Sequence, residues 1–112
     1  MPATDVFYVV LDSHADILIF EGLASAISGY EASEVIGKNW FEIFIPEQNL
    51  GEMHTVFDAF FNGDISFWKY KNAIACKDGT YKDIEWTNTL LRDKSNNPIK
   101  VICKGNLSQT DT

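Results

Sequence analysis

Hydrophobic and polar residues alternate along residues 81–93, YKDIEWTNTLLRD, which is typical of a β-strand with one buried face. The apolar row contains Ile84, Trp86, Asn88 and Leu90, and the polar row contains Asp83, Glu85, Thr87 and Thr89. Asn88 is the exception, because it is an amide among apolar neighbours. A buried amide without a hydrogen-bond partner costs about 1–3 kcal/mol. Either the protein or a bound molecule must therefore supply partners for Asn88.

The same reading predicts five strands and one longer helix. The strands are expected over residues 7–11, 17–20, 67–77, 81–92 and 99–104, and the helix over residues 50–61. Between the second strand and this helix the apolar positions are irregular and are interrupted by Gly29 and Gly37, which predicts several short helical turns. Two strands, then helices, then three strands indicate an α+β domain with the helices on one face of an antiparallel sheet.

Composition and charge limit the classes of function. The 112 residues suffice for one domain with one core, and 46% of them are hydrophobic. The net charge is -7 and the nine lysines and arginines do not cluster, which argues against a nucleic-acid partner. No apolar run is long enough for direct membrane insertion and no signal peptide opens the chain, so we expect a cytoplasmic domain, whether or not the full-length protein is attached to a membrane.

Four stretches, in this order and spacing, resemble the PAS domain, the sensor module of many signalling proteins. They are ISGYEASEVIGKNWFEIFIP (27–46), YKNAIACKDGT (70–80), IEWTNTLLRD (84–93) and VICKGN (101–106). The version is similar to the PAS type found upstream of bacterial histidine kinases and diguanylate cyclases. The resemblance implies a five-stranded antiparallel sheet that cups a pocket under the short helices and the longer helix. We expect residues 1–112 to be one such domain, cut from a longer multidomain signalling protein.

In the PAS arrangement, the face of the strand that carries Asn88 points to the pocket, as does the face of the preceding strand that carries Asn72. Two amides, a phenol and an indole N–H in an apolar hollow are suited to orient a small ligand. The predicted ligand-binding residues are Phe41, Phe44, Phe57, Tyr70, Asn72, Ile74, Trp86, Asn88 and Leu90. The alternative is that the two asparagines bond to each other or to backbone carbonyls of the helices, because most buried polar groups are satisfied internally.

Cofactor binding is a further hypothesis. A histidine on the longer helix ligates haem in one oxygen-sensing PAS branch, and His54 occupies the rim of the apolar face of residues 50–61. A lone histidine carries little specificity, so the alternative is a half-exposed surface side chain. The light-sensing branch has a reactive cysteine where this chain has Trp40, and flavin-reading asparagines where it has Ile74 and Ile84. Flavin photochemistry of that kind is therefore not expected.

We expect a sensory domain that binds a small-molecule ligand or a partner and relays the signal to a C-terminal effector in cis, a histidine kinase or a diguanylate cyclase. The relay would be a population shift between sheet geometries. The alternatives are a ligand-free dimerisation module and a haem or flavin redox or gas sensor. Catalytic triads, phosphate-binding glycine loops and the HExxH motif are absent from the sequence, so the domain itself is not expected to be an enzyme.

Two further expectations concern the sheet. Its outer face is expected to mediate a homodimer, unless a helix from outside this sequence covers it, because it is more apolar than a face that meets only water. The residues assigned to that face are Phe67, Ala73, Ala75, Tyr81, Thr87, Thr89, Leu91 and Ile102. Cys76 and Cys103 are expected to be free thiols, because in the PAS strand order an intervening strand separates them by about 10 Å.

Overall fold

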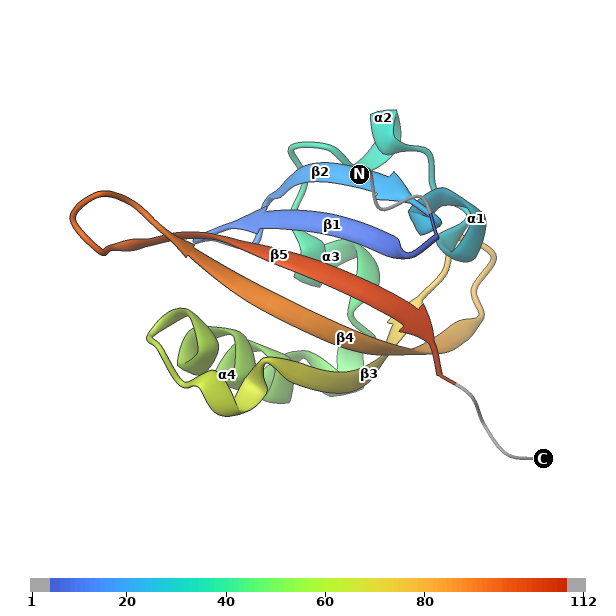
Figure 1. Ribbon diagram of the computed structural model, residues 1–112. Helices are drawn as coiled ribbons and strands as arrows, with labels where there is room; N and C mark the ends of the chain where they lie inside the picture. The colour runs from blue at the N-terminus through green and yellow to red at the C-terminus, as the bar shows by residue number, and fades with distance from the viewer. Residues whose placement is uncertain (1–4, 109–112) are drawn as a thin grey trace.

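The computed structural model describes residues 5–108. Its strands are β1 (Phe7–Asp12), β2 (Ile17–Gly22), β3 (Lys69–Ala75), β4 (Tyr81–Arg92) and β5 (Pro98–Leu107). Its helices are α1 (Ala24–Ser28), α2 (Ala32–Val35), α3 (Trp40–Phe44) and α4 (Leu50–Phe61), with two 3-10 turns, η1 (Glu47–Asn49) and η2 (Ile65–Phe67). The strands form one antiparallel sheet in the order β2-β1-β5-β4-β3 (Figure 1). The predicted fold class is confirmed.

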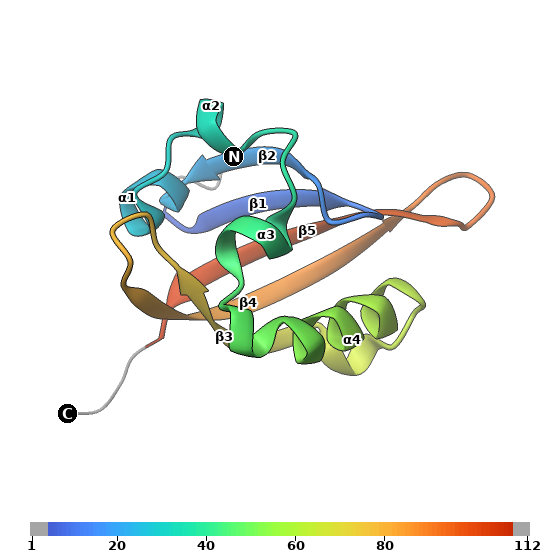
Figure 2. The ribbon, with the colours of Figure 1, turned by 180° about the vertical axis from the view of Figure 1, so that it is seen from behind.

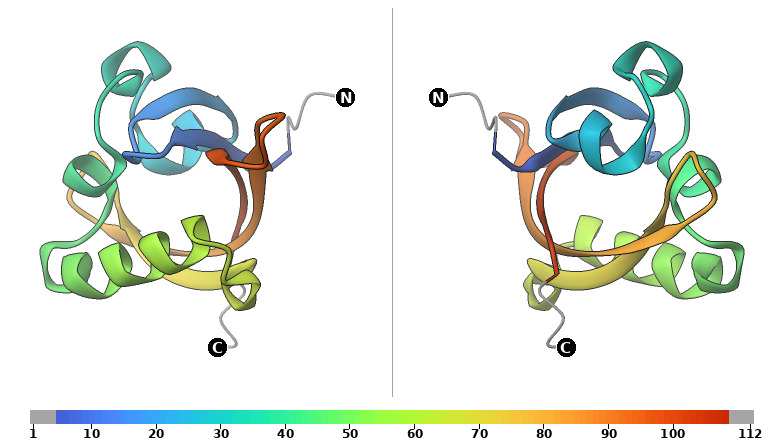
Figure 3. Two further views of the ribbon diagram at one scale, coloured as in Figure 1. Left: turned by 90° about the vertical axis from the view of Figure 1, so that its left-hand side faces the viewer. Right: turned by 90° about the vertical axis from the view of Figure 1, so that its right-hand side faces the viewer.

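The helices lie on one face of the sheet, as the view from behind shows (Figure 2). Seen end-on, the sheet is strongly curved, and α3 and α4 close its open side (Figure 3). The helix α4 has the predicted bounds, and short helical turns precede it as expected. Gly29 ends α1 with a φ of 85°, a left-handed conformation that glycine adopts without steric cost. None of the helices in residues 5–108 is long and apolar enough to span a membrane.

An aspartate side chain stabilises each of the three hairpin turns. Asp12 accepts hydrogen bonds from the backbone N–H groups of residues 14 and 16, at 2.8 and 3.0 Å. Asp78 accepts from the N–H and hydroxyl of Thr80, and Asp93 accepts from the N–H groups of residues 95 and 97. Such side-chain bonds imitate the backbone of a turn and fix where each strand ends. They also lower the pKa of Asp78 and of Asp93.

The third strand begins later than predicted. The side chain of Asp64 accepts hydrogen bonds from the N–H and the hydroxyl of Ser66, at 3.1 and 2.6 Å, so the chain makes one more turn before it extends at Lys69. Phe67 therefore lies in η2, and its side chain faces the helix side of the sheet. Its assignment to the outer face was wrong. The last strand is longer than predicted and reaches Leu107.

The alternation along β4 is confirmed. Ile84 and Trp86 are buried and Asn88 and Leu90 are half-buried, whereas Asp83, Glu85, Thr87 and Thr89 are exposed. The strand β4 also lies between β3 and β5, and both cysteines are free thiols, as expected.

A glycine allows the core to close over β5. Gly105 pairs with Trp86 on β4 and with Phe7 on β1. A Cβ at this position would lie 2.5 Å from Ile84 and 2.7 Å from the indole of Trp86, both too short for a real contact. The absence of a side chain therefore lets the Trp86 ring lie against the β5 backbone.

Candidate ligand-binding site

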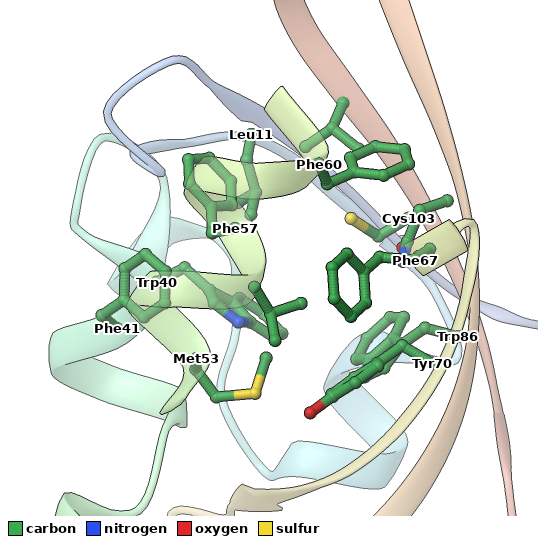
Figure 4. Close-up of a pocket in the computed structure, with 13 residues that line it drawn as sticks. Leu11, Trp40, Phe41, Met53, Phe57, Phe60, Phe67, Tyr70, Trp86 and Cys103 are labelled. Carbon is green, nitrogen blue, oxygen red and sulfur yellow. The ribbon is translucent and has the colours of Figure 1, made fainter. Parts of the chain in front are cut away.

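A cavity of about 70 Å³ lies between α3 and α4 on one side and the sheet on the other. Its wall comes from α3, α4, η2 and all strands except β2. The lining residues are Leu11, Trp40, Phe41, Met53, Val56, Phe57, Phe60, Phe67, Tyr70, Trp86, Asn88, Val101 and Cys103 (Figure 4). The wall is almost entirely apolar, so an apolar molecule would gain free energy by leaving water for this space.

Asn88 is the amide in this wall, and the protein satisfies it only in part. Its backbone N–H donates to the carbonyl of Trp68 at 2.7 Å, and its side-chain Nδ2 donates to the carbonyl of Phe67 at 3.2 Å. No group in residues 5–108 donates to its Oδ1. Because no buried side-chain oxygen or nitrogen in the described part of the chain lacks a partner, this oxygen must be accessible. Asn88 thus offers an acceptor to a bound molecule.

Asn72 has a different role. Its Oδ1 accepts a hydrogen bond from the indole N–H of Trp86 at 2.8 Å, and its Nδ2 lies 3.4 Å from the sulfur of Met53. Both polar ends of the amide are therefore used inside the protein, and Asn72 does not line the cavity. Asn72 therefore follows the alternative in which the protein itself supplies the hydrogen-bond partners. These partners are the side chains of Trp86 and Met53. The bond fixes the orientation of Trp86, which does line the cavity.

Tyr70 connects the cavity wall to α4. Its hydroxyl donates a hydrogen bond to the carboxylate of Glu52 at 2.6 Å. This bond, reinforced by partial burial and by the carboxylate charge, raises the pKa of Tyr70 to about 12. The bond joins β3 to the first turn of α4, so it holds together the two elements that border the cavity on that side.

Two sulfur atoms also face the cavity. Met53 comes from α4 and Cys103 comes from β5, where it pairs with Asn88 across the sheet (Figure 4). Desolvation raises the pKa of Cys103 to about 12, although part of its surface borders the cavity. The group is therefore a neutral thiol at physiological pH, and it contributes a soft apolar surface rather than a nucleophile.

The structure brings five of the nine predicted residues into the cavity wall: Phe41, Phe57, Tyr70, Trp86 and Asn88. The other four, Phe44, Asn72, Ile74 and Leu90, do not line it. Phe44 is fully buried among Phe7, Phe20 and Trp40 instead, and Ile74 is fully buried near the far end of β3. Leu90 lies beyond Asn88, where it borders a separate groove.

His54 does not enter the cavity. It is exposed, and its ring stacks on Phe41 with centroids 4.1 Å apart. A cavity of about 70 Å³ holds on the order of five water-sized atoms, since one water needs about 10–15 Å³. These residues do not fit a haem or a flavin, because the candidate axial ligand lies outside and the space is far too small.

Sequence reasoning missed eight lining residues, which are Leu11, Trp40, Met53, Val56, Phe60, Phe67, Val101 and Cys103. A signal for two of them was available. The five-residue turn between β4 and β5 sets a register in which Val101 lies opposite Leu90 and Cys103 lies opposite Asn88. Residues that face each other across an antiparallel pair point to the same side of the sheet.

The comparisons with known proteins agree with this geometry. The family model described as PAS fold matches residues 18–104, so the chain belongs to the PAS-fold family. No relative was matched among curated proteins.

Three solved structures illustrate the likeness. The PAS domain of the RpfR quorum-sensing receptor from Cronobacter turicensis, in complex with BDSF, is 25% identical with a TM-score of 0.71, covering 94% of this chain and 95% of that one. The Cycle PAS-B domain of Drosophila melanogaster, with bound ethylene glycol, is 15% identical with a TM-score of 0.76, covering 91% and 99%. A PAS domain from Desulfitobacterium hafniense is 12% identical with a TM-score of 0.78, covering 93% of both chains. The last two show the shared fold only.

Proposed function

We propose that this domain is a cytoplasmic sensory module that binds a small, mostly apolar molecule in the cavity under α4. The observation that carries the proposal is the combination of an apolar cavity with the accessible amide oxygen of Asn88, because apolar walls with a few placed polar groups are typical of small-molecule sites. The RpfR PAS domain, which is solved in complex with BDSF, supports it. The domain has no catalytic role in this proposal.

The signal would pass through β5. Val101 and Cys103 of this strand line the cavity, and Met53 and Val56 of α4 line it from the other side. A ligand that contacts both elements favours whichever spacing of helix and sheet suits it best, which is a shift between conformational populations. We propose that an effector domain in cis, a histidine kinase or a diguanylate cyclase, reads this change beyond the C-terminal end of β5.

Two opposite substitutions at one position test the site. Val56→Phe fills the cavity and Val56→Ala enlarges it, and position 56 is only half-buried, so both are compatible with folding. Small apolar fragments are titrated into each protein, and the methyl resonances of Met53 and Val101 are followed by NMR. We expect saturable shifts in the wild type and in Val56→Ala, and none in Val56→Phe. Shifts that persist in Val56→Phe, or their absence in every form, would contradict the proposal.

We also propose homodimerisation through the outer face of the sheet. Strand register places Ile19, Ile102 and Thr89 on that face around Val10, which is itself already buried. Tyr81 and Leu91 add exposed apolar surface, with 55% and 36% of each residue accessible. An isologous pair of such faces would bury this surface in both copies at once.

Light scattering over a dilution series tests the dimer. Leu91→Lys places a charge on the outer face, and we expect it to lower the apparent mass at a given concentration. Ile99→Lys is the matched control, because Ile99 is similarly exposed (40%) but shares the parity of Val101, which faces the helices. A wild-type monomer at all concentrations, or equal effects of the two substitutions, would remove the outer face from the proposal.

A further inference from the structure

A groove at the C-terminal end of α4 adjoins the cavity. Its walls are formed by Phe60, Gly63, Trp68, Asn88, Thr89, Leu90 and Arg92, and its volume is about 300 Å³. Phe60 and Asn88 belong to the walls of both spaces. The cavity and the groove, which we call the Arg92 groove, therefore adjoin at these two side chains.

Arg92 is the single arginine of the chain and is exposed, and its guanidinium has no carboxylate partner among residues 5–108. Nη1 donates to the carbonyl of Asn96 at 3.0 Å, which uses one of five N–H donors. Nη2 lies over Gly63, 3.6 Å from where a Cβ there would stand. In residues 5–108 no carboxylate lies within ion-pair distance of Arg92, since the ion pair there is Lys77 with Glu34. The adjacent carboxylate, Asp93, accepts backbone N–H groups of its own turn.

The rest of the groove also lacks negative charge. None of its wall residues is acidic, although the chain has 16 aspartates and glutamates and a net charge of -7. Trp68 is half-exposed, and the ammonium of Lys69 lies 5.1 Å from the centroid of its ring. A second cation thus lies beside the groove. In a chain with this excess of acid, a groove with an unpaired guanidinium and no carboxylate is a place where an anion is favoured.

We infer that the ligand of this domain is a small amphipathic monocarboxylate, with its apolar tail in the cavity and its carboxylate on Arg92. This inference rests on the proposed function of the cavity. An arginine can donate two parallel hydrogen bonds to a carboxylate, a geometry that a lysine cannot reproduce. Because the cavity holds on the order of five water-sized atoms, the tail has about four to six carbons. The site therefore selects both for a head group and for a chain length.

Calorimetric titration of straight-chain carboxylates, each paired with the alcohol of equal length, tests the inference. We expect carboxylates with tails of about four to six carbons to bind more tightly than shorter ones and than their alcohols. Arg92→Gln should weaken the carboxylates by about tenfold or more, as expected for loss of a charge-assisted bond, and leave the alcohols unchanged. Arg92→Lys should restore part of the affinity. The matched control is Lys94→Gln, which removes a charge from the neighbouring turn outside the groove and should change nothing.

The outcomes separate the two levels of the proposal. Equal binding of alcohols and carboxylates with no effect of Arg92→Gln overturns the carboxylate inference and leaves the apolar sensor site intact. Equal losses in Arg92→Gln and Lys94→Gln also overturn it, because they indicate a general effect of charge. Failure of every compound to bind, in the wild type and in the enlarged Val56→Ala form, overturns both the inference and the proposed function. Melting temperatures of the variants show that each is folded during the titration.

Discussion

One half of the core is packed with aromatic rings, and the other half contains the cavity. Under α1 to α3, the ring of Phe7 meets four other aromatic rings edge-on at centroid distances of 5.2 to 6.3 Å. Phe44 stacks on Trp40 at 4.4 Å in the same cluster. Under α4 the side chains of Met53, Val56 and Phe57 are only partly buried and surround the cavity. The aromatic half can stabilise the fold while the half that contains the cavity binds a ligand.

The two halves share a wall. Trp40 and Trp86 belong to the aromatic cluster and also line the cavity. Of the 12 residues in α4, only Phe60 and Phe61 are buried. Few buried side chains therefore attach this helix to the sheet. An element with little buried surface is the one expected to move at least cost. The comparison therefore assigns stability to the Phe7 cluster and adaptability to α4.

The largest expected effect comes from truncating one phenylalanine in each half. Phe44→Ala should destabilise the protein by about 3–5 kcal/mol, because it leaves a void in a packed cluster. Phe57→Ala should cost less, about 2 kcal/mol, because Phe57 is half-buried and already borders empty space. Urea unfolding measures both. Equal losses of unfolding free energy would show that the two halves do not differ.

Gly105→Ala tests the packed side of the shared wall. The new Cβ would overlap Ile84 and Trp86, and relief of such overpacking typically costs about 1–3 kcal/mol. Gly51→Ala, in α4, is the control, because a Cβ there meets nothing within 4 Å and alanine favours helix by up to about 1 kcal/mol. Thermal unfolding should show opposite shifts for the two variants. A neutral Gly105→Ala would mean that Trp86 does not lie against β5.

Trp86→Phe tests the hydrogen bond that orients the Trp86 ring in the cavity wall. The substitution removes the indole N–H and leaves Oδ1 of Asn72 without its partner, which should cost about 1–3 kcal/mol. Asn72→Leu removes the other side of the same bond. In a double-mutant cycle the two losses should be non-additive, because they share one interaction. Additive losses would show that the bond does not form in solution.

The smallest expected effect is a loss of stability at alkaline pH. In the folded protein the pKa of Tyr70 is raised from 10.0 to about 12, so folding favours the neutral phenol. This contribution is complete below pH 10 and is lost as the pH rises towards about 12. The loss should stay below about 1 kcal/mol, because the pair is solvent-screened.

Glu52→Gln removes the cause of this shift. The pKa of Tyr70, followed by tyrosinate absorbance, should then move towards its ordinary value, whereas Glu47→Gln in η1 should leave it unchanged. An unaltered pKa in Glu52→Gln would show that the carboxylate is not the partner of Tyr70.

Much of the fold followed from the sequence because local signals agreed with the tertiary structure. The strict alternation of β4 and the helical spacing of α4 gave both elements their observed bounds. Phe67 was misplaced because an apolar residue before a strand looks like part of it, while the side chain of Asp64 in fact adds a turn. That aspartate, two residues before a serine, was the local signal for the turn.

The candidate site was less predictable, because it depends on which strands are neighbours. Asn88 and Trp86 were predicted from strand parity together with the resemblance to the PAS arrangement. Cys103 and Val101 required the β4–β5 register, and Arg92 required knowledge that its side chain lies near Gly63. Asn72 shares the parity of the cavity residues and yet is excluded from the wall, because its amide is occupied by Trp86. Whether Asn72 bonds to Trp86 or faces the cavity depends on distances between side chains, which a sequence pattern does not contain.

Xenon binding tests the central contrast most directly, because xenon occupies apolar cavities and needs no particular chemistry. A crystal of the protein under xenon pressure should show the gas under α4, in contact with Met53, Phe57 and Val101, and nowhere among the rings around Phe7. In Val56→Phe the same site should be empty. Xenon within the Phe7 cluster, or its absence under α4 in the wild-type protein, would contradict the account.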